Sequence, residues 1–149
     1  MLARLSTKGN PPFTNSMNDI QALIPQHKFD TDRARAAIQA GYPAVAPILP
    51  QLLAWLQDYN WPVAPVLAPF LISIGKPLIP HIQNILLSQD ETWKYWIISI
   101  IIRNSPELAL SFRDDLERLA LSPTDREVSE ELDGVARQVL NEAGWNKTG

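Results

Sequence analysis

The sequence contains no cysteine among its 149 residues, which excludes disulfide bridges, thiolate metal ligands and cysteine nucleophiles. Its only histidines, His27 and His81, are too far apart for a local metal-ligand motif. The six glycines are dispersed, so the chain has neither a phosphate-binding loop nor a dinucleotide-binding turn. We therefore predict no enzyme activity, catalytic residue, metal site or cofactor, although a site assembled from distant residues stays open.

Long hydrophobic runs are also missing. The most apolar stretches, residues 61–74 and 96–102, are shorter than the roughly 18 residues that span a bilayer, and the N-terminus lacks a secretory signal pattern. The 13 basic and 16 acidic residues give a net charge of −3, with a pI near 5.3. This balance argues against a general binder of nucleic acid or anionic membranes. We expect a soluble, cytoplasmic protein with neither kind of partner.

Hydrophobic residues make up 46% of the chain, enough to fill one core. Residues 1–17 are rich in turn-forming Asn, Gly and Pro and have no apolar periodicity, so they are predicted to form a flexible N-terminal tail. Residues 18–149 are predicted to form a single domain, because this length is typical of one compact unit.

Proline and glycine divide the domain into segments with helical periodicity, and strict two-residue alternation is absent. Caps are predicted at Asp30 or Thr31 and at four further positions, Asn60, Asp90, Ser105 and Ser122, whereas Gly41, Gly75 and Gly144 are placed to end helices. These signals predict an all-α fold of about seven helices. A short segment, residues 18–24, precedes seven longer ones, which cover residues 31–40, 43–59, 61–74, 77–87, 91–104, 107–121 and 123–143.

Two short patterns recur at a similar distance. The segment that begins with Gly41 resembles the one that begins with Gly75, and the segment 58–61 resembles the segment 90–93. Such recurrence is typical of stacked helical hairpins, which bury one another's apolar faces. The units resemble HEAT repeats, in which an aspartate at the turn accepts backbone N–H groups of the second helix. Asp58 and Asp90 match that position. The resemblance implies a short right-handed α-solenoid.

The region 18–143 also resembles the bacterial family called domain of unknown function 5071. The resemblance depends on the strings LIPQHKFD, LPQLLAWLQDYNWPVA, PLIPHI and DETWKYW, which begin at residues 23, 49, 77 and 90. It implies a helical-repeat fold and brings no assigned activity.

Formal charge is distributed unevenly along the chain. Between Ala36 and Gln89 only Asp58 and Lys76 are charged, whereas residues 111–149 hold 14 of the 29 charges. One interpretation is that the central helices are flanked on both sides and the last helix is a solvated end cap. The alternative is an exposed apolar surface in the middle, available to a partner or to a second copy of the chain.

Three prolines, Pro62, Pro65 and Pro69, recur at helical spacing in the most apolar segment. Pro62 fits a first turn, whereas the other two are expected inside the helix, where each removes an N–H donor. The pattern favours a bent structural helix. The alternative is that the freed carbonyls and Trp61 help to form a recognition groove.

The tryptophans carry the prediction of a binding surface. Trp93 and Trp96 lie three residues apart on one side of a helix, a pattern most often found in cores. Trp61 and Trp93, however, occupy equivalent repeat positions near a turn, and Trp is enriched at binding hot spots. The predicted partner-binding residues, which include the loop before Asp30, are Asn60, Trp61, Trp93, Lys94, Tyr95, Arg103, His27 and Lys28.

These features predict a protein-interaction or scaffold module with an unidentified protein partner. An immunity-type role, in which the domain neutralises a toxin, is one form of that hypothesis. The alternative from another class is a small-ligand-binding or enzymatic helical-repeat protein. Self-association through the weakly charged middle is a third hypothesis.

Overall fold

Helices form all the regular structure of residues 17–145, the part of the chain that the computed structural model describes, and no strand occurs there. The predicted all-α class is confirmed. The expected N-terminal tail lies outside the described residues except for Met17, which begins α2 (Met17–Gln21). Residues 146–149 also lie outside them.

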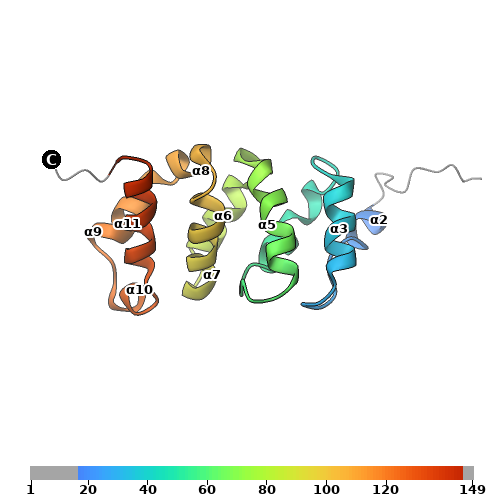
Figure 1. The fold of residues 1–149 in the computed structure, drawn as a ribbon, viewed down its shortest axis with the longest axis horizontal. Coiled ribbons are helices and arrows are strands. Elements are labelled where there is room, and N and C mark those ends of the chain that lie inside the picture. Colours follow the sequence, from blue (N-terminus) through green and yellow to red (C-terminus); the bar gives the residue numbers. More distant parts are fainter. Residues whose placement is uncertain (1–16, 146–149) are drawn as a thin grey trace, which may run out of the picture.

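Four helical segments lie side by side in chain order and form one layer (Figure 1). Contacts join each member to the next along this row. The row therefore places residues that are far apart in the sequence beside one another. Its members are α3 (Thr31–Ala40), α5 (Val63–Ile74), the continuous stretch of α7 (Glu91–Trp96) with the π-helix η3 (Ile97–Ile102), and α11 (Leu132–Glu142).

The remaining helices alternate with this row along the chain. The 3₁₀ turns η1 (Ala46–Ile48) and η2 (Lys76–Leu78) lead directly into α4 (Leu49–Ala54) and α6 (Ile79–Leu86). Next come α8 (Pro106–Ser111), α9 (Arg113–Leu121) and the short α10 (Asp125–Ser129), which connects α9 to α11. Apolar side chains from both sets form one buried core that extends from Ile20 to Leu140.

The expected number of helices was too low, because the described residues contain ten α-helices, α2 to α11. Two long predicted helices are each divided. Phe112 separates α8 from α9, and Glu130 and Glu131 separate α10 from α11. Glu131 has a left-handed backbone with φ 63°, which no continuous right-handed helix allows.

Three of the predicted caps are confirmed. The side chains of Asp30, Asp90 and Ser105 accept from backbone N–H groups in the first turns of α3, α7 and α8. The predicted ends at Gly41 and Gly75 are confirmed as well, with φ of 77° and 74°. A 3₁₀ turn follows after each of these glycines, so the two predicted repeat units share this feature.

Two other predicted caps were wrong. The N-cap of α5 is Pro62 rather than Asn60, because the Asp58 carboxylate instead folds the preceding turn by accepting from the Asn60 N–H at 2.8 Å. Asp58 therefore forms a turn, whereas Asp90, which the sequence repeat predicts to be its counterpart, caps a helix. The N-cap of α10 is Thr124 rather than Ser122, because Thr124 and Glu127 form a reciprocal capping box.

One of the two prolines expected inside the helix of α5 lies in its first turn instead. The helix begins at Val63, so Pro65 lies in its first turn, where an N–H has no intrahelical acceptor. Only Pro69 lies in the interior, and the side chains of Pro65 and Pro69 are both exposed.

Within residues 17–145 no single helix is long and apolar enough to cross a membrane. Only α5 and the η2–α6 segment taken together reach the required length and apolarity, and a bend of 109° separates them.

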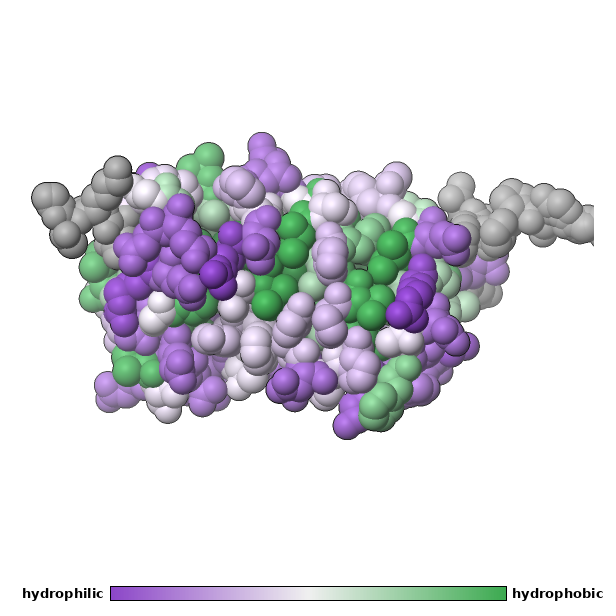
Figure 2. All heavy atoms as spheres, viewed as in Figure 1, coloured by the Kyte–Doolittle hydropathy of each residue, from purple (hydrophilic) through white to green (hydrophobic). Residues whose placement is uncertain are grey.

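Charge collects at the two ends of the row. Figure 2 shows hydrophilic residues over α11 at one end and α3 at the other, with apolar side chains visible between the helices in the middle. On α5, Leu67 and Leu71 are buried while Pro65 and Pro69 are exposed. The weakly charged middle thus contributes to the core and also leaves uncharged side chains at the surface.

Candidate functional site

Trp93 is fixed by contacts on both its backbone and its ring. Its backbone N–H donates to Oδ1 of Asp90 at 3.0 Å in the first turn of α7. Its indole Nε1 donates to the carbonyl oxygen of Leu53, near the end of α4, at 3.1 Å. The ring is half-buried and packs against the core. Trp93 therefore joins two helices of different layers while one part of its ring remains accessible.

Three hollows adjoin one another around α7. The acidic hollow has a volume of about 580 Å³, the apolar hollow about 160 Å³ and the outer hollow about 240 Å³. The acidic hollow is lined by Gln57, Ser88, Gln89, Asp90, Glu91, Thr92, Trp93, Arg126 and Glu130. The apolar hollow is lined by Pro50, Leu53, His81, Asn84, Ile85 and Trp93. The outer hollow is lined by Thr92, Tyr95, Trp96, Glu130 and Glu131.

Shared side chains form the boundaries between these hollows. Trp93 lines both the apolar and the acidic hollow. Thr92 and Glu130 line both the acidic and the outer hollow, and the Thr92 hydroxyl donates to Oε1 of Glu130 at 3.1 Å. The three hollows consequently form one uneven surface, which offers apolar, acidic and aromatic contacts in turn. We call this surface the α7 groove.

A buried pair of charges, Glu91 and Lys94, adjoins the α7 groove. Glu91 and Lys94 are each 8% exposed, and Lys94 Nζ lies 3.4 Å from Oε2 of Glu91. Oε1 of Glu91 lies 3.1 Å from Nε of Arg126, whose side chain is 63% exposed. Charged residues are rarely buried unless they are paired, and this cluster satisfies that condition across α7 and α10.

A second ion pair lies beside Lys94. A small hollow lined by Lys94, Asp115 and Glu127 among others connects it to α9. Arg118 donates two hydrogen bonds to Glu127 and holds the pKa of that carboxyl below its ordinary value. Burial raises the pKa of Asp115, and the neighbouring Asp114 raises it further. The groove is thus attached to α9 and α10 by charged contacts.

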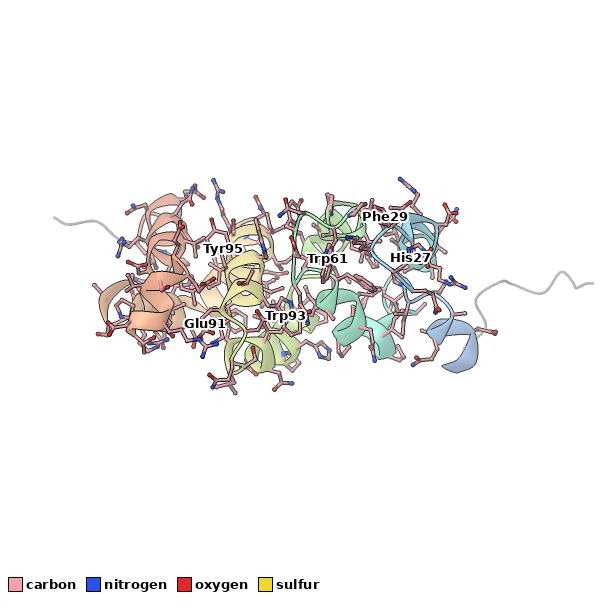
Figure 3. The ribbon with its side chains drawn as sticks, turned by 90° about the horizontal axis from the view of Figure 1, so that it is seen from below. His27, Phe29, Trp61, Glu91, Trp93 and Tyr95 are labelled. Atoms are coloured by element: carbon pink, nitrogen blue, oxygen red, sulfur yellow. The ribbon has the colours of Figure 1, made fainter. Side chains whose placement is uncertain are left out.

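The structure brings two of the predicted binding residues to the α7 groove. Trp93 separates two of its hollows, and Tyr95 lines the outer hollow with its ring edge against Trp96, 5.2 Å between centroids. Figure 3 shows Glu91, Trp93 and Tyr95 projecting from α7 in the view from below. Lys94 belongs to the same helix, but its ammonium group is buried against Glu91 and is not part of the accessible surface.

A second group of predicted residues lies further along the same side of the molecule. The N–H of Val63 donates to the carbonyl oxygen of Lys28 at 3.1 Å, which places the loop before α3 beside the start of α5. Figure 3 shows His27 and Trp61 in this region. Trp61 is half-buried and meets Trp55 edge-on, 5.5 Å between centroids. His27, Lys28 and Asn60 are exposed.

Arg103 lies apart from the other candidates. It follows η3, at the opposite end of the α7–η3 stretch from Trp93. Its guanidinium donates two hydrogen bonds of 2.9 Å to Glu142 of α11 and holds the pKa of that carboxyl below its ordinary value. Arg103 therefore fastens η3 to α11 and does not line the α7 groove.

Sequence reasoning missed most of the polar lining of the groove. His81 and Asn84 come from α6, and Arg126 and Glu130 from the segment after α9. Glu130 and Glu131 fall within the segment 123–143 that was expected to be one helix, but they lie between two helices and both line the outer hollow. The four-residue spacing of Arg126 and Glu130 hints that both project to one side, but nothing in the sequence links them to α7. Within residues 17–145 no group of three or more His, Asp or Glu could hold a metal ion.

Comparison with known proteins places the chain in a family. A family model described as domain of unknown function, DUF5071, matches residues 23–140, so the chain belongs to that family. The match covers the whole α7 groove, from Pro50 to Glu131. A comparison with curated proteins found no match.

Proposed function

We propose that this member of the DUF5071 family is a protein-interaction module and that it binds its partner through the α7 groove. The architecture we propose for it is a short right-handed α-solenoid of HEAT-like helical hairpins. The serial contacts of α3, α5, η3 and α11 support that architecture, as do the matched helix ends at Gly41 and Gly75.

The observation that carries the proposal is the position of Trp93. Its indole is half-buried, hydrogen-bonded to Leu53 and placed between an apolar and an acidic hollow. A rigid aromatic ring with apolar surface on one side and polar groups on the other is typical of an interface hot spot. Because the ring is already fixed in the free protein, little side-chain entropy is lost when a partner binds.

The open shape of the groove, rather than its volume, favours a protein segment over a small molecule. Small-ligand sites enclose most of their ligand, whereas the acidic and outer hollows are wide and shallow. Adjoining shallow hollows with an aromatic centre and a polar rim resemble the anatomy of protein interfaces. A partner would need to cover more than the groove, because stable complexes bury about 1,600 Å² in total.

The loop containing His27 and Lys28, together with Asn60 and Trp61, extends the proposed interface. Of these residues, His27 and Trp61 are seen on the same side of the molecule as Trp93 (Figure 3). A partner that spans both regions would contact both sets of predicted residues. Neutralisation of a toxin is one form that such binding would take.

The test compares two neighbouring positions on α6. Asn84 is exposed and lines the apolar hollow, whereas the adjacent Gln83 is exposed and does not line it. Tagged wild-type protein, Asn84→Arg and Gln83→Arg are used to capture proteins from cells that produce the chain, and captured candidates are then titrated as purified proteins. We expect Asn84→Arg to weaken binding at least tenfold and Gln83→Arg to leave it unchanged, with equal melting temperatures.

Three outcomes would contradict the proposal. The first is equal binding by the two variants, which would place the interface elsewhere. The second is a wild-type protein that retains no protein but binds a small molecule, as the ligand-binding alternative predicts. The third is a second copy of the chain as the sole bound protein, which sedimentation at several concentrations would reveal as self-association.

A further inference from the structure

Glu91 is a buried carboxylate with an unused acceptor atom. It is 8% exposed, and its Oε2 is paired with Lys94. Within residues 17–145, no group donates a hydrogen bond to its Oε1, which is shielded by the surrounding atoms. Leaving a buried acceptor without a donor is costly, and most such groups in folded proteins have a partner. Glu91 lines the acidic hollow together with Arg126, whose Nε lies 3.1 Å from this shielded oxygen, so a donor from outside reaches Oε1 only when the Arg126 side chain moves away.

Arg126 is near this oxygen but binds it incompletely. Its Nε lies 3.1 Å from Oε1 of Glu91 without a hydrogen bond between them, and its Nη2 donates to the carbonyl oxygen of Gln89 at 2.8 Å. By contrast, the guanidinium of Arg118 gives two hydrogen bonds to the carboxylate of Glu127. Arg126 is therefore an exposed side chain that neutralises Glu91 without saturating it.

The rest of the hollow is also suited to a cation. Asp90, Glu91 and Glu130 contribute three carboxylates to its lining, whereas the positive charges beside them are those of Arg126 and of Lys94, which is paired with Glu91, so the cluster stays net negative. Trp93 supplies an indole wall. A guanidinium group binds carboxylates through paired N–H groups and stacks on aromatic faces, so it matches both features of this lining.

We propose that the acidic hollow binds an arginine side chain of the partner protein, which donates to Oε1 of Glu91 beside the Trp93 indole. Arg126 occupies part of this position in the free protein and gives way to the partner. The adjoining apolar hollow then receives an apolar side chain from the same segment of the partner. This inference rests on the proposed function, because it specifies the chemistry of the segment that the α7 groove recognises.

The test uses synthetic peptides on the full 149-residue protein. The probes are acetyl-Leu-Gly-Arg-Gly-amide, the same peptide with citrulline in place of arginine, and acetyl-arginine-amide. Binding is followed by the indole N–H resonance of Trp93, which is assigned with Trp93→Phe. We expect the arginine peptide to bind at least fivefold more tightly than acetyl-arginine-amide, because it also fills the apolar hollow. The neutral citrulline peptide is expected to cause no saturable shift.

Two variants test the roles of the charges. Arg126→Ala removes the internal competitor and is expected to bind the arginine peptide at least threefold more tightly. The double variant Asp90→Asn, Glu130→Gln is expected to bind it at least tenfold more weakly. This double variant should fold, because Asn is as good a helix cap as Asp. Glu117→Gln on α9, an exposed carboxylate remote from the hollow lining, serves as a control and should bind like wild type.

Each result has a definite meaning. Equal binding of the citrulline and arginine peptides would overturn the inference, as would an unchanged affinity in the double variant. Acetyl-arginine-amide binding as tightly as the longer peptide would indicate a free small cation as the natural ligand. If Asn84→Arg abolishes capture of a protein while these peptides do not bind, the proposed function holds and only the inference fails. Peptide binding without any captured protein would retain a guanidinium site at the acidic hollow but contradict the proposed function, and with it the protein partner that the inference names.

Discussion

The guanidinium of Arg118 on α9 binds the carboxylate of Glu127 on α10 through two hydrogen bonds of 3.1 and 2.6 Å. The same carboxylate accepts from the N–H of Thr124 at 2.8 Å, completing the capping box. Glu127 is buried, whereas Arg118 is half exposed. This one carboxylate therefore fixes the start of α10 and ties it to α9.

Glu127→Gln should destabilise the fold by about 2 kcal/mol at pH 7, because it removes the charge from a hydrogen-bonded pair. Because Gln still completes the capping box, the loss of unfolding free energy measures the contribution of the ion pair. Because the pKa of Glu127 is lowered on folding, its stabilisation is present above the ordinary value of 4.5 and is lost as the pH falls through the folded pKa. Urea unfolding of both proteins at pH 7 and pH 3 measures this difference.

Exposed pairs provide the control for that experiment. Arg113 and Glu117 form a pair on α9 in which both side chains are about 40% exposed. Glu117→Gln should therefore change the unfolding free energy by less than about 0.5 kcal/mol at either pH. An equal loss of unfolding free energy in the two variants would show that the burial of Glu127 contributes nothing. A loss in Glu127→Gln that is the same at pH 7 and pH 3 would show that the stabilisation does not depend on ionisation of this carboxylate.

Two glycines differ in what a methyl group would meet. Gly75 has φ of 74°, and an added Cβ would collide with the carboxylate of Glu107. Gly134 lies inside α11 with no atom within 4 Å of an added Cβ. Gly75→Ala should destabilise the fold by about 1–2 kcal/mol, and Gly134→Ala should stabilise it by about 0.5–1 kcal/mol. Urea unfolding curves check both values, and the opposite signs make each variant a control for the other.

Glu131 offers a third test of backbone conformation. Its φ of 63° is unfavourable for any residue with a Cβ, and glycine adopts it freely. Glu131→Gly should therefore stabilise the fold by up to about 1 kcal/mol in urea unfolding. Glu130 has φ of −99°, so Glu130→Gly should destabilise. Stabilisation by both variants would point to charge repulsion between the two carboxylates as the cause.

The sequence was sufficient for the features that depend on local chemistry. Asp30, Asp90 and Ser105 cap helices as predicted, and Gly41 and Gly75 end them, because each signal acts within one turn. The division at Phe112 was not predictable in the same way. It lies in a charged segment with continuous helical periodicity, and its conformation depends on packing against the core.

The α7 groove could not be predicted from the sequence alone, because its lining comes from α4, α6, α7 and α10, which only the fold brings together. Trp93 was predicted as a binding residue from its residue type and its predicted repeat position, and Tyr95 was predicted as part of the same set. Arg126 and Glu130 were not, because charged residues at helical spacing are usually solvated and nothing in the sequence marks contact across more than 30 residues. In the structure, the hydrogen bonds from Thr92 to Glu130 and from Arg126 to Gln89 make this contact.

Substitutions of Trp93 must separate its structural role from its binding role. Trp93→Ala should destabilise the fold by about 3 kcal/mol, because it leaves a cavity between α4 and α7 and removes the hydrogen bond to Leu53. Loss of binding in that variant would therefore not identify an interface. Trp93→Phe keeps a ring between the hollows and removes the donor, so it should cost about 1 kcal/mol in urea unfolding.

Trp61→Phe is the matched variant, at the position that the sequence pattern predicts to be equivalent to Trp93. Its ring contacts Trp55 edge-on, a contact that Phe retains in part, so the expected loss is smaller than for Trp93→Phe. If Trp93 is a binding anchor, Trp93→Phe should weaken partner binding more than Trp61→Phe does, after both are measured at a temperature where each variant is fully folded. Equal effects on binding would place the two tryptophans in one continuous interface, whereas a loss confined to Trp61→Phe would move the anchor from the α7 groove to the loop beside α5.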